Sequence, residues 1–439
     1  MKTKQRLPGE FLHGIATILA VAVAAIALTS MGQASSTYQS IHHFTGADGA
    51  APVGDLILDA SGNLYGVATF GGSGTCFGSG CGAVFKLSKT SAGGWARTIL
   101  YSFTGGNDGF FPDAGLVLDG SGNLYGTAAF GGAYHYGVVF KLSPTAAGKW
   151  KRTVLHAFHY GEDGATPKGK LVFDAAGNLY GTTQAGGGTP NSGIVFELSP
   201  TAANSWRETV LYRFTGRSDG RNPIAGLVFD AAGNLYGTTQ FGGDTSDGVV
   251  FELSPNFSGG WTETVLHAFN RSDGEFPEAS VIFGASGNLY GTTTIGGDLT
   301  ACGGFGCGVV YELSPNSSGG WTETVLHAFE RGPKANGGYG GAESTTDLAV
   351  DAAGNLYGTT AFGGRAGVYA GVVFKLSPNS DGTWSEAVLH AFYDNADGGY
   401  PNSGLTLDAA GTLFGMTNAG GNRTYCGGAG CGVVFEITP

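Results

Sequence analysis

The sequence predicts an all-β fold, a β-propeller of seven four-stranded blades whose ring is closed by the N-terminal strand. Three observations support this fold: a long repeat, the content of each repeat, and the way the two chain ends complement each other. The motif GNLYG and its variants occur seven times, 54 to 67 residues apart. Its aromatic residue falls at Tyr65, Tyr125, Tyr180, Tyr236, Tyr290, Tyr357 and Phe414.

Each complete repeat contains four short segments with the composition of β-strands. In the fourth repeat they are residues 226–230, 234–239, 248–253 and 261–269. Val, Leu, Phe, Tyr and Thr dominate these segments, and Gly, Asn, Ser and Pro separate them as in tight hairpins. Four antiparallel strands at this period are typical of a propeller blade. The 81 Gly residues follow no period of three, so a collagen-like chain is excluded.

The two chain ends supply complementary parts of one repeat. Six Trp residues open the fourth strand of repeats one to six, whereas the seventh repeat stops after its third strand, at 432–439. Residues 38–44, YQSIHHF, match the fourth-strand segment TVLHAF and precede the first repeat. We therefore expect the N-terminal strand to complete the last blade, which makes residues 35–439 one domain.

The repeat unit is similar to two known families. The order of LYGTT, a Gly-Gly pair, a variable loop, VVFELSP and Trp resembles a kelch blade. The fuller pattern DAAGNLYGTT…GG…GVVFELSP…W.ETVLHAF resembles the GloVer tandem repeat, a choice-of-anchor family of exported bacterial proteins. The resemblance covers nearly all of residues 38–439. It implies an exported propeller and brings no catalytic residues. Members often carry a C-terminal anchor, whereas this chain ends on a strand.

Residues 1–34 have the composition of a secretory signal peptide. Lys2, Lys4 and Arg6 precede an apolar run over 15–28, and small residues follow at 32–34. The apolar run is shorter than the roughly 20 residues that span a bilayer. We expect a leader that is cleaved, although an uncleaved anchor is the alternative, and a product that is extracellular, periplasmic or associated with the cell surface.

The charge of the mature chain restricts its partners. Without the leader, 19 basic and 33 acidic residues leave a net charge of −14. An acidic surface without a basic cluster argues against nucleic acid and anionic membranes as partners. We expect no membrane span after cleavage, and a monomer that binds a glycan or a protein.

The residues that recur in every repeat are best explained as structural. The LYGTT segments occur too often to form one active site. A His or Tyr recurs in TVLHAF, where a half-buried ring with one hydrogen-bonding end fits both; a metal or acid–base role is the alternative. Six loops contain Asp-Gly-x-x-Pro, which is typical of a turn; a ring of Ca²⁺-binding carboxylates is the alternative, and we expect no other cofactor. These aspartates are Asp48, Asp108, Asp163, Asp219, Asp273 and Asp397.

The six cysteines form three pairs with one spacing, each in the loop between the second and third strands of a blade. We expect local disulfides at Cys76–Cys81, Cys302–Cys307 and Cys426–Cys431. The alternative is a four-cysteine zinc site shared by blades one and seven, which leaves the pair of blade five unexplained.

One face of the propeller is predicted to carry the function. The loops from strand two to three and from strand four to one open on the same face and vary in length and chemistry. We interpret this face as a binding surface with exposed aromatic and polar residues. The candidates are Phe110, Phe111, Tyr134, His135, Tyr136, Phe276, Tyr339, Arg365, Tyr369, Tyr400, Arg423 and Tyr425.

Catalytic motifs are nearly absent. The sequence has no HExxH and no GK[ST]. Glu343 and Asp347, in the irregular stretch 330–347, form a possible carboxylate pair for a glycan hydrolase or lyase. We therefore predict a non-catalytic binding protein and keep a carbohydrate-active enzyme and a purely structural envelope component as alternatives.

Overall fold

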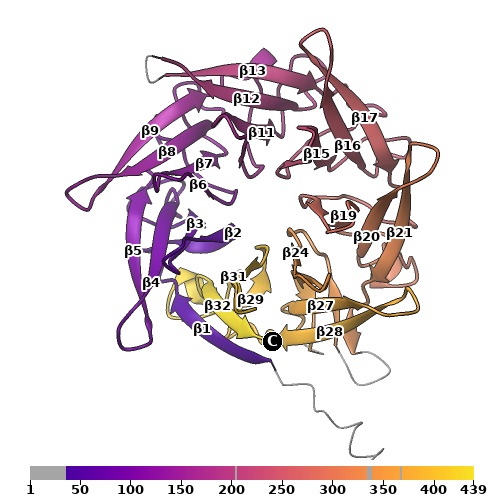
Figure 1. The fold of residues 1–439 in the computed structure, drawn as a ribbon. Coiled ribbons are helices and arrows are strands. Elements are labelled where there is room, and N and C mark those ends of the chain that lie inside the picture. Colours follow the sequence, from indigo (N-terminus) through magenta and orange to yellow (C-terminus); the bar gives the residue numbers. More distant parts are fainter. Residues whose placement is uncertain (1–35, 203–204, 334–338, 366–367) are drawn as a thin grey trace, which may run out of the picture.

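The computed structural model describes residues 36–202, 205–333, 339–365 and 368–439. The predicted signal peptide lies outside these residues. Seven β-sheets are arranged as a ring around a central channel (Figure 1). The predicted seven-bladed propeller is confirmed. No helix among the described residues is long and apolar enough to cross a membrane.

Each blade consists of four antiparallel strands. The innermost strands are β2 (Ala50–Leu58), β6 (Val117–Leu118), β10 (Val172–Phe173), β14 (Val228–Phe229), β18 (Ile282–Phe283), β24 (Ala349–Val350) and β30 (Thr406–Leu407). The second strands are β3 (Leu64–Phe70), β7 (Leu124–Ala128), β11 (Leu179–Thr183), β15 (Leu235–Thr239), β19 (Leu289–Thr292), β25 (Leu356–Thr360) and β31 (Leu413–Ala419). Most innermost strands are shorter than the sequence predicts.

The third and outermost strands are longer. The third strands are β4 (Ala83–Lys89), β8 (Val138–Pro144), β12 (Ile194–Pro200), β16 (Val249–Pro255), β20 (Val309–Pro315), β27 (Val372–Pro378) and β32 (Val433–Thr438). The outermost strands are β5 (Trp95–Ser102), β9 (Trp150–Ala157), β13 (Trp206–Arg213), β17 (Trp261–Ala268), β21 (Trp321–Ala328), β28 (Trp384–Ala391) and β1 (Thr37–His43).

A few short elements lie outside this scheme. They are β22 (Gly332–Pro333), β23 (Tyr339–Ala342), β26 (Phe362–Gly363) and β29 (Gly399–Pro401), and the 3₁₀ turns η1 (Gly161–Asp163), η2 (Cys302–Gly304) and η3 (Cys426–Gly428). Strands β22, β23 and β26 form a small sheet within the loops of blade six.

The N-terminal strand closes the ring as predicted. Strand β1 pairs antiparallel with β32, with Thr37 opposite Thr438 and His43 opposite Val433 (Figure 1). Phe44, which follows β1, packs edge-to-face on Phe85 of blade one, with 5.2 Å between the ring centroids. Equivalent aromatic pairs join all the other neighbouring blades. The interface of blades seven and one therefore has the same aromatic contact as every other blade interface.

Candidate functional site

The two sets of variable loops lie together on one face, which we call the loop face. In each blade the second Gly of the Gly-Gly pair donates its N–H to a carbonyl of the strand-four-to-one loop, as from Gly132 to Gly106 at 3.1 Å. The approach of the two loops leaves no room for a side chain: a Cβ on Gly186 would lie 2.4 Å from Gly164 Cα. The Gly-Gly pairs thus build the face on which the other loop residues are displayed.

A backbone latch also joins each loop to the preceding blade. The residue before the Pro of each Asp-Gly-x-x-Pro loop, and Glu343 at the equivalent point of blade six, adopts a φ of 49° to 59°. Its N–H donates to a carbonyl of the preceding blade at 2.7 to 3.1 Å. The latch residues are Ala51, Phe111, Thr166, Asn222, Phe276, Glu343 and Tyr400. Three predicted binding residues, Phe111, Phe276 and Tyr400, are therefore half-buried latch residues rather than fully exposed side chains.

The strongest apolar feature of the loop face lies between blades one and two. Phe70, Phe77, Phe110, Phe111 and Phe130 form a continuous cluster, with centroids of contacting rings 4.9 to 6.2 Å apart. We call it the phenylalanine cluster. Phe77 is 84% exposed and Phe130 39% exposed. The sequence-based prediction contained Phe110 and Phe111 but missed Phe77, although its place inside a cysteine-closed loop was a usable signal.

The remaining predicted residues are spread around the face. Tyr134, His135, Tyr136, Arg423 and Tyr425 are exposed. The ring of Tyr134 lies 5.7 Å from that of His159, and the ring of Tyr136 lies 5.0 Å from that of Tyr160. Arg423 pairs with Asp394 at 2.8 Å. These contacts are local to single blades or neighbouring blades.

Two further candidates lie in the loop of blade six. Arg365 is stacked over Tyr393 at 4.1 Å, and Arg331 over Tyr369 at 5.2 Å. The side chain of Tyr339 lies outside the described part of the structure. The structure therefore does not bring the predicted residues into one pocket.

The three cysteine pairs are disulfides, as predicted. Each pair closes a short loop on the loop face, and each loop carries or adjoins an exposed aromatic residue: Phe77, Phe305 and Tyr425. Cross-linking restricts the conformations of the loop. The disulfides therefore hold these aromatic side chains in place, and the zinc alternative is wrong.

The six aspartates of the Asp-Gly-x-x-Pro loops are held as turn residues. Each accepts a hydrogen bond from a backbone N–H of its own loop. Each also contacts the recurring His or Tyr of the outermost strand at 2.9 to 3.3 Å. The pairs are His42–Asp48, Tyr101–Asp108, His156–Asp163, Tyr212–Asp219, His267–Asp273 and His390–Asp397. Calcium binding by these carboxylates stays a prediction.

A third residue, from the next blade, completes what we call a blade joint. It is the third residue of the fourth-strand segment: Tyr38, Arg97, Arg152, Glu208, Glu263, Glu323 and Glu386. Arg97 pairs with Asp48 at 3.2 Å, whereas Tyr38 stacks on His390 with centroids 3.9 Å apart. Burial would raise the pKa of Asp48, but hydrogen bonds from His42 and Thr45 outweigh it and hold the pKa at about 2.

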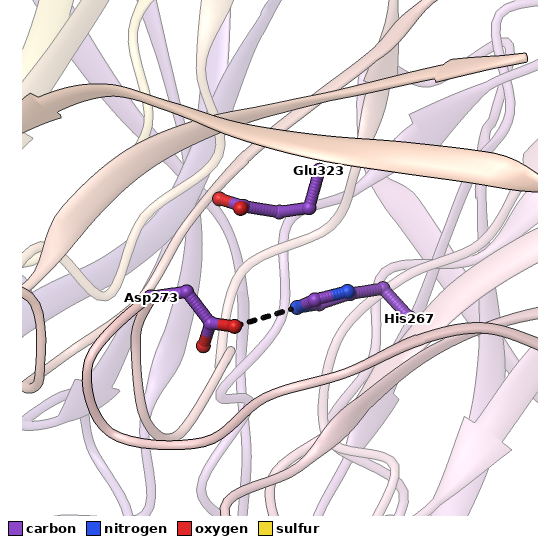
Figure 2. A group of neighbouring side chains, drawn as sticks. All are labelled: His267, Asp273 and Glu323. Atoms are coloured by element: carbon purple, nitrogen blue, oxygen red, sulfur yellow. Dashed lines mark ion pairs between the residues drawn. The ribbon is translucent and has the colours of Figure 1, made fainter. Parts of the chain in front are cut away.

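One blade joint has the donor set of a metal site. Figure 2 shows His267, Asp273 and Glu323, whose ligand atoms all lie within 4.8 Å of one another. A His nitrogen and two carboxylates suit several divalent metals. The same joint, however, is built elsewhere with Tyr212 in place of the His and with Arg97 in place of the Glu. We therefore interpret the trio as a structural joint.

The possible catalytic pair Glu343 and Asp347 is divided between two features. Glu343 is a latch residue, whereas Asp347 lines the channel, where its Oδ1 accepts the Ser280 N–H at 2.7 Å. Asp347 instead lines one cavity with Asp55 and Lys170, and we call these three residues the channel group. The Lys170 Nζ lies 3.0 Å from the Asp55 Oδ2. The sequence signal for this channel group was available: these positions differ between repeats that are otherwise almost identical.

The fold and the loop face define a β-propeller repeat protein. Residues 27–189 and 148–347 match the Gloeobacter/Verrucomicrobia repeat. These matches cover more than half of the chain, which therefore belongs to that family, and the predicted resemblance to the GloVer repeat is confirmed. A comparison with curated proteins finds no match.

The chain is similar to solved structures at low sequence identity. PorZ, an essential bacterial surface component of the type-IX secretion system of Porphyromonas gingivalis, is 14% identical with a TM-score of 0.50. The similarity covers 91% of this chain but 48% of PorZ, so the chain spans about half the length of that protein. A protein of unknown function from Dyadobacter fermentans is 12% identical, with a TM-score of 0.43 and coverage of 92% and 100%.

Proposed function

We propose that this protein is an extracytoplasmic, non-catalytic binding protein that takes a glycan or a protein ligand on its loop face. The observation that carries the proposal is the phenylalanine cluster, in which Phe77 is 84% exposed. Large exposed apolar clusters are uncommon on proteins without partners. Aromatic side chains at the centre of a contact also contribute much of the binding free energy.

The disulfide and the hydrogen bond that hold the loops of the phenylalanine cluster also favour a binding role. Phe77 lies inside the loop closed by Cys76 and Cys81. Phe111 is fixed by its latch hydrogen bond to the Cys81 carbonyl at 3.1 Å. A surface that is already ordered loses little conformational entropy when a ligand binds. The cluster is therefore a preorganised contact area.

The proposed location rests on the cysteines and on the leader. Disulfides persist in oxidising compartments and are rare in the cytosol. All six cysteines are paired. The leader-like composition of residues 1–34 also favours an extracytoplasmic location, and we propose that the chain is exported.

Ligand capture by cluster variants tests this function. Glycan arrays and pull-downs from the native envelope fraction would compare the wild type with Phe77→Ser/Phe130→Ser. We expect at least a tenfold loss of affinity, equivalent to about 1.4 kcal/mol. Phe257→Ser is the matched control, because Phe257 is fully exposed in the turn between β16 and β17, outside the loop face. Equal binding by the double variant and the wild type would contradict the proposal.

A further inference from the structure

Two rings of side chains in the central channel break the repeat. The residues after the loop Pro, and their equivalent in blade six, form the mouth ring: Val53, Asp113, Lys168, Ile224, Glu278, Thr345 and Asn402. Two positions further along each strand lies the inner ring: Asp55, Gly115, Lys170, Gly226, Ser280, Asp347 and Gly404. The mouth ring has a different residue in every blade. By contrast, the adjacent LYGTT strand is the same in four repeats, so the channel positions vary where the neighbouring strand does not.

Both rings line one cavity of about 370 Å³ that is continuous with the loop face. A second cavity, on the side of the one-to-two turns, shares Asp55, Lys170 and Asp347 with it. The inner ring therefore forms a polar floor across the channel. The volume of the first cavity is in the range of small-molecule sites.

One glycine of the inner ring makes room for a charged side chain. A Cβ on Gly404 would lie 2.2 Å from Asp55 Oδ1, so a larger residue there would displace the Asp55 carboxylate. Asp55 thus extends over the strand of blade seven, and Lys170 extends past blade two to reach Asp55 at 3.0 Å.

The cavity carries more negative than positive groups. Four carboxylates, at positions 55, 113, 278 and 347, face two ammonium groups, at positions 168 and 170. Asp55 is neutralised by Lys170, and Glu278 accepts a hydrogen bond from Gln240 at 2.5 Å. Asp347 has the Ser280 N–H as its donor but no cation of its own at ion-pair distance in the described structure. Burial and the nearby Asp55 raise the pKa of Asp347 to about 7, although Lys170 acts in the opposite direction.

We propose that this cavity binds a small organic cation, an amine or guanidinium compound whose charged group pairs with Asp347. Such a ligand would supply the positive charge that the channel lacks at Asp347. Asn402 and Thr345, on the same side of the mouth ring, are hydrogen-bonded to each other at 2.7 Å and offer polar contacts to the rest of the ligand. A bare divalent cation fits less well, because Asp55 is already paired with Lys170, and Ca²⁺ takes about six to eight oxygen ligands.

Calorimetric titration of the purified chain tests the proposal. The probes are agmatine, putrescine and glucosamine, with glucose as the uncharged match of glucosamine and CaCl₂ as the metal. We expect at least one of the three amines to bind with a Kd below about 1 mM, and glucose and Ca²⁺ to give no binding heat. Failure of all three amines to bind, or equal binding of glucose, would overturn the proposal. Ca²⁺ binding that is lost in Asp347→Asn would replace it with a metal site.

Variants locate the amine within the protein. Asp347→Asn is expected to weaken amine binding at least tenfold, whereas Asp244→Asn, an equal change of charge on an exposed loop outside the cavity, leaves it unaltered. Ile224→Trp fills the mouth ring without changing charge and is expected to block binding, which provides a second test if Asp347→Asn does not fold. Amine affinity that is unchanged in both channel variants would contradict the assignment. Phe77→Ser/Phe130→Ser is expected to bind amines normally, which separates this site from the proposed contact on the loop face.

Discussion

At the scale of single residues, the most repeated side chains satisfy one another rather than a ligand. Tyr236, in the segment AAGNLYGTT, is buried and donates its hydroxyl to Asp230 at 3.2 Å. Asp230 also accepts the N–H groups of Ala232 and Asn234 at 2.8 Å, which fixes the turn before the strand. In blade five the Tyr hydroxyl also has a carboxylate acceptor, although Gly284 replaces the Asp: Tyr290 donates to Glu312 at 2.9 Å.

Removing one hydroxyl of this network gives the first prediction at this scale. Tyr236→Phe is expected to lower the free energy of unfolding by about 1 kcal/mol, because one hydrogen bond to the turn is lost while the ring remains. Asp230→Ala removes several bonds of the same turn and is expected to cost about twice as much or more. Urea denaturation measures both. A Tyr236→Phe protein that is less stable than Asp230→Ala would contradict the view that the Tyr236 hydroxyl acts only through its bond to the turn.

At the scale of the strand, a β-bulge explains how the blade joints form. In each outermost strand the Leu or Ile before the recurring His or Tyr has no partner on the third strand. In blade four, Val250 pairs with His267 and Phe251 pairs with Val265, so the residue between them, Leu266, is left unpaired. A bulge bends its strand and changes the direction of the next side chain. It therefore brings His267 to Asp273 of the following loop. The sequence showed that His and Tyr are interchangeable here, but no sequence spacing showed the bulge or the neighbouring blade's Glu323.

The Glu residues of the blade joints predict a pH dependence of stability. Burial raises the pKa of Glu208, Glu263 and Glu323 to about 7, from 4.5 in an unfolded chain. The folded state therefore holds these protons more tightly, and its stability falls as the pH rises from about 4.5 through 7. We expect the triple Glu→Gln variant to lose less stability than the wild type between pH 5.5 and 8. Urea midpoints at the two pH values measure this difference.

The sign of the effect distinguishes these Glu residues from Asp48, the aspartate of the blade joint that contains Arg97. Asp48 has a lowered pKa of about 2, so its contribution is lost only as the pH falls below about 4. A gap between the triple variant and the wild type that is the same at pH 5.5 and 8 would contradict the buried state of the three Glu residues.

At the scale of the whole molecule, the sequence predicted the architecture well and the site only in part. Repeat spacing, the Trp residues and the unmatched chain ends were enough for seven blades and the closure by β1, because these depend on local strand patterns. The phenylalanine cluster was partly missed, since Phe70 and Phe77 of blade one meet Phe130 of blade two only once the blades are packed side by side. The channel group was missed as well. Its members, Asp55, Lys170 and Asp347, belong to blades one, three and six.

Closure of the ring gives a prediction for the whole molecule. A chain that begins after Phe44 lacks β1, which leaves the edge of β32 unpaired and the Phe85 ring uncovered. Exposed strand edges invite pairing between molecules. We expect this truncation to lower Tm by roughly 10 °C or more and to promote self-association, whereas a chain beginning at Ser36 keeps the full Tm. Differential scanning calorimetry and size-exclusion chromatography measure the two effects.

A circular permutant separates closure from chain continuity. Thr37 lies opposite Thr438, so a short linker can join Pro439 to Ser36, and the new ends can be placed in the exposed turn around Phe257. In this permutant β1 becomes a covalent continuation of β32, and every strand pair except the opened turn is unchanged. We expect a monomer whose Tm lies within a few degrees of the wild type. If the truncated chain were as stable as this permutant, β1 would contribute nothing to the stability of the ring, and the other strands would close it alone. If both were unstable, the opened turn between β16 and β17 would be as important to the fold as the seam.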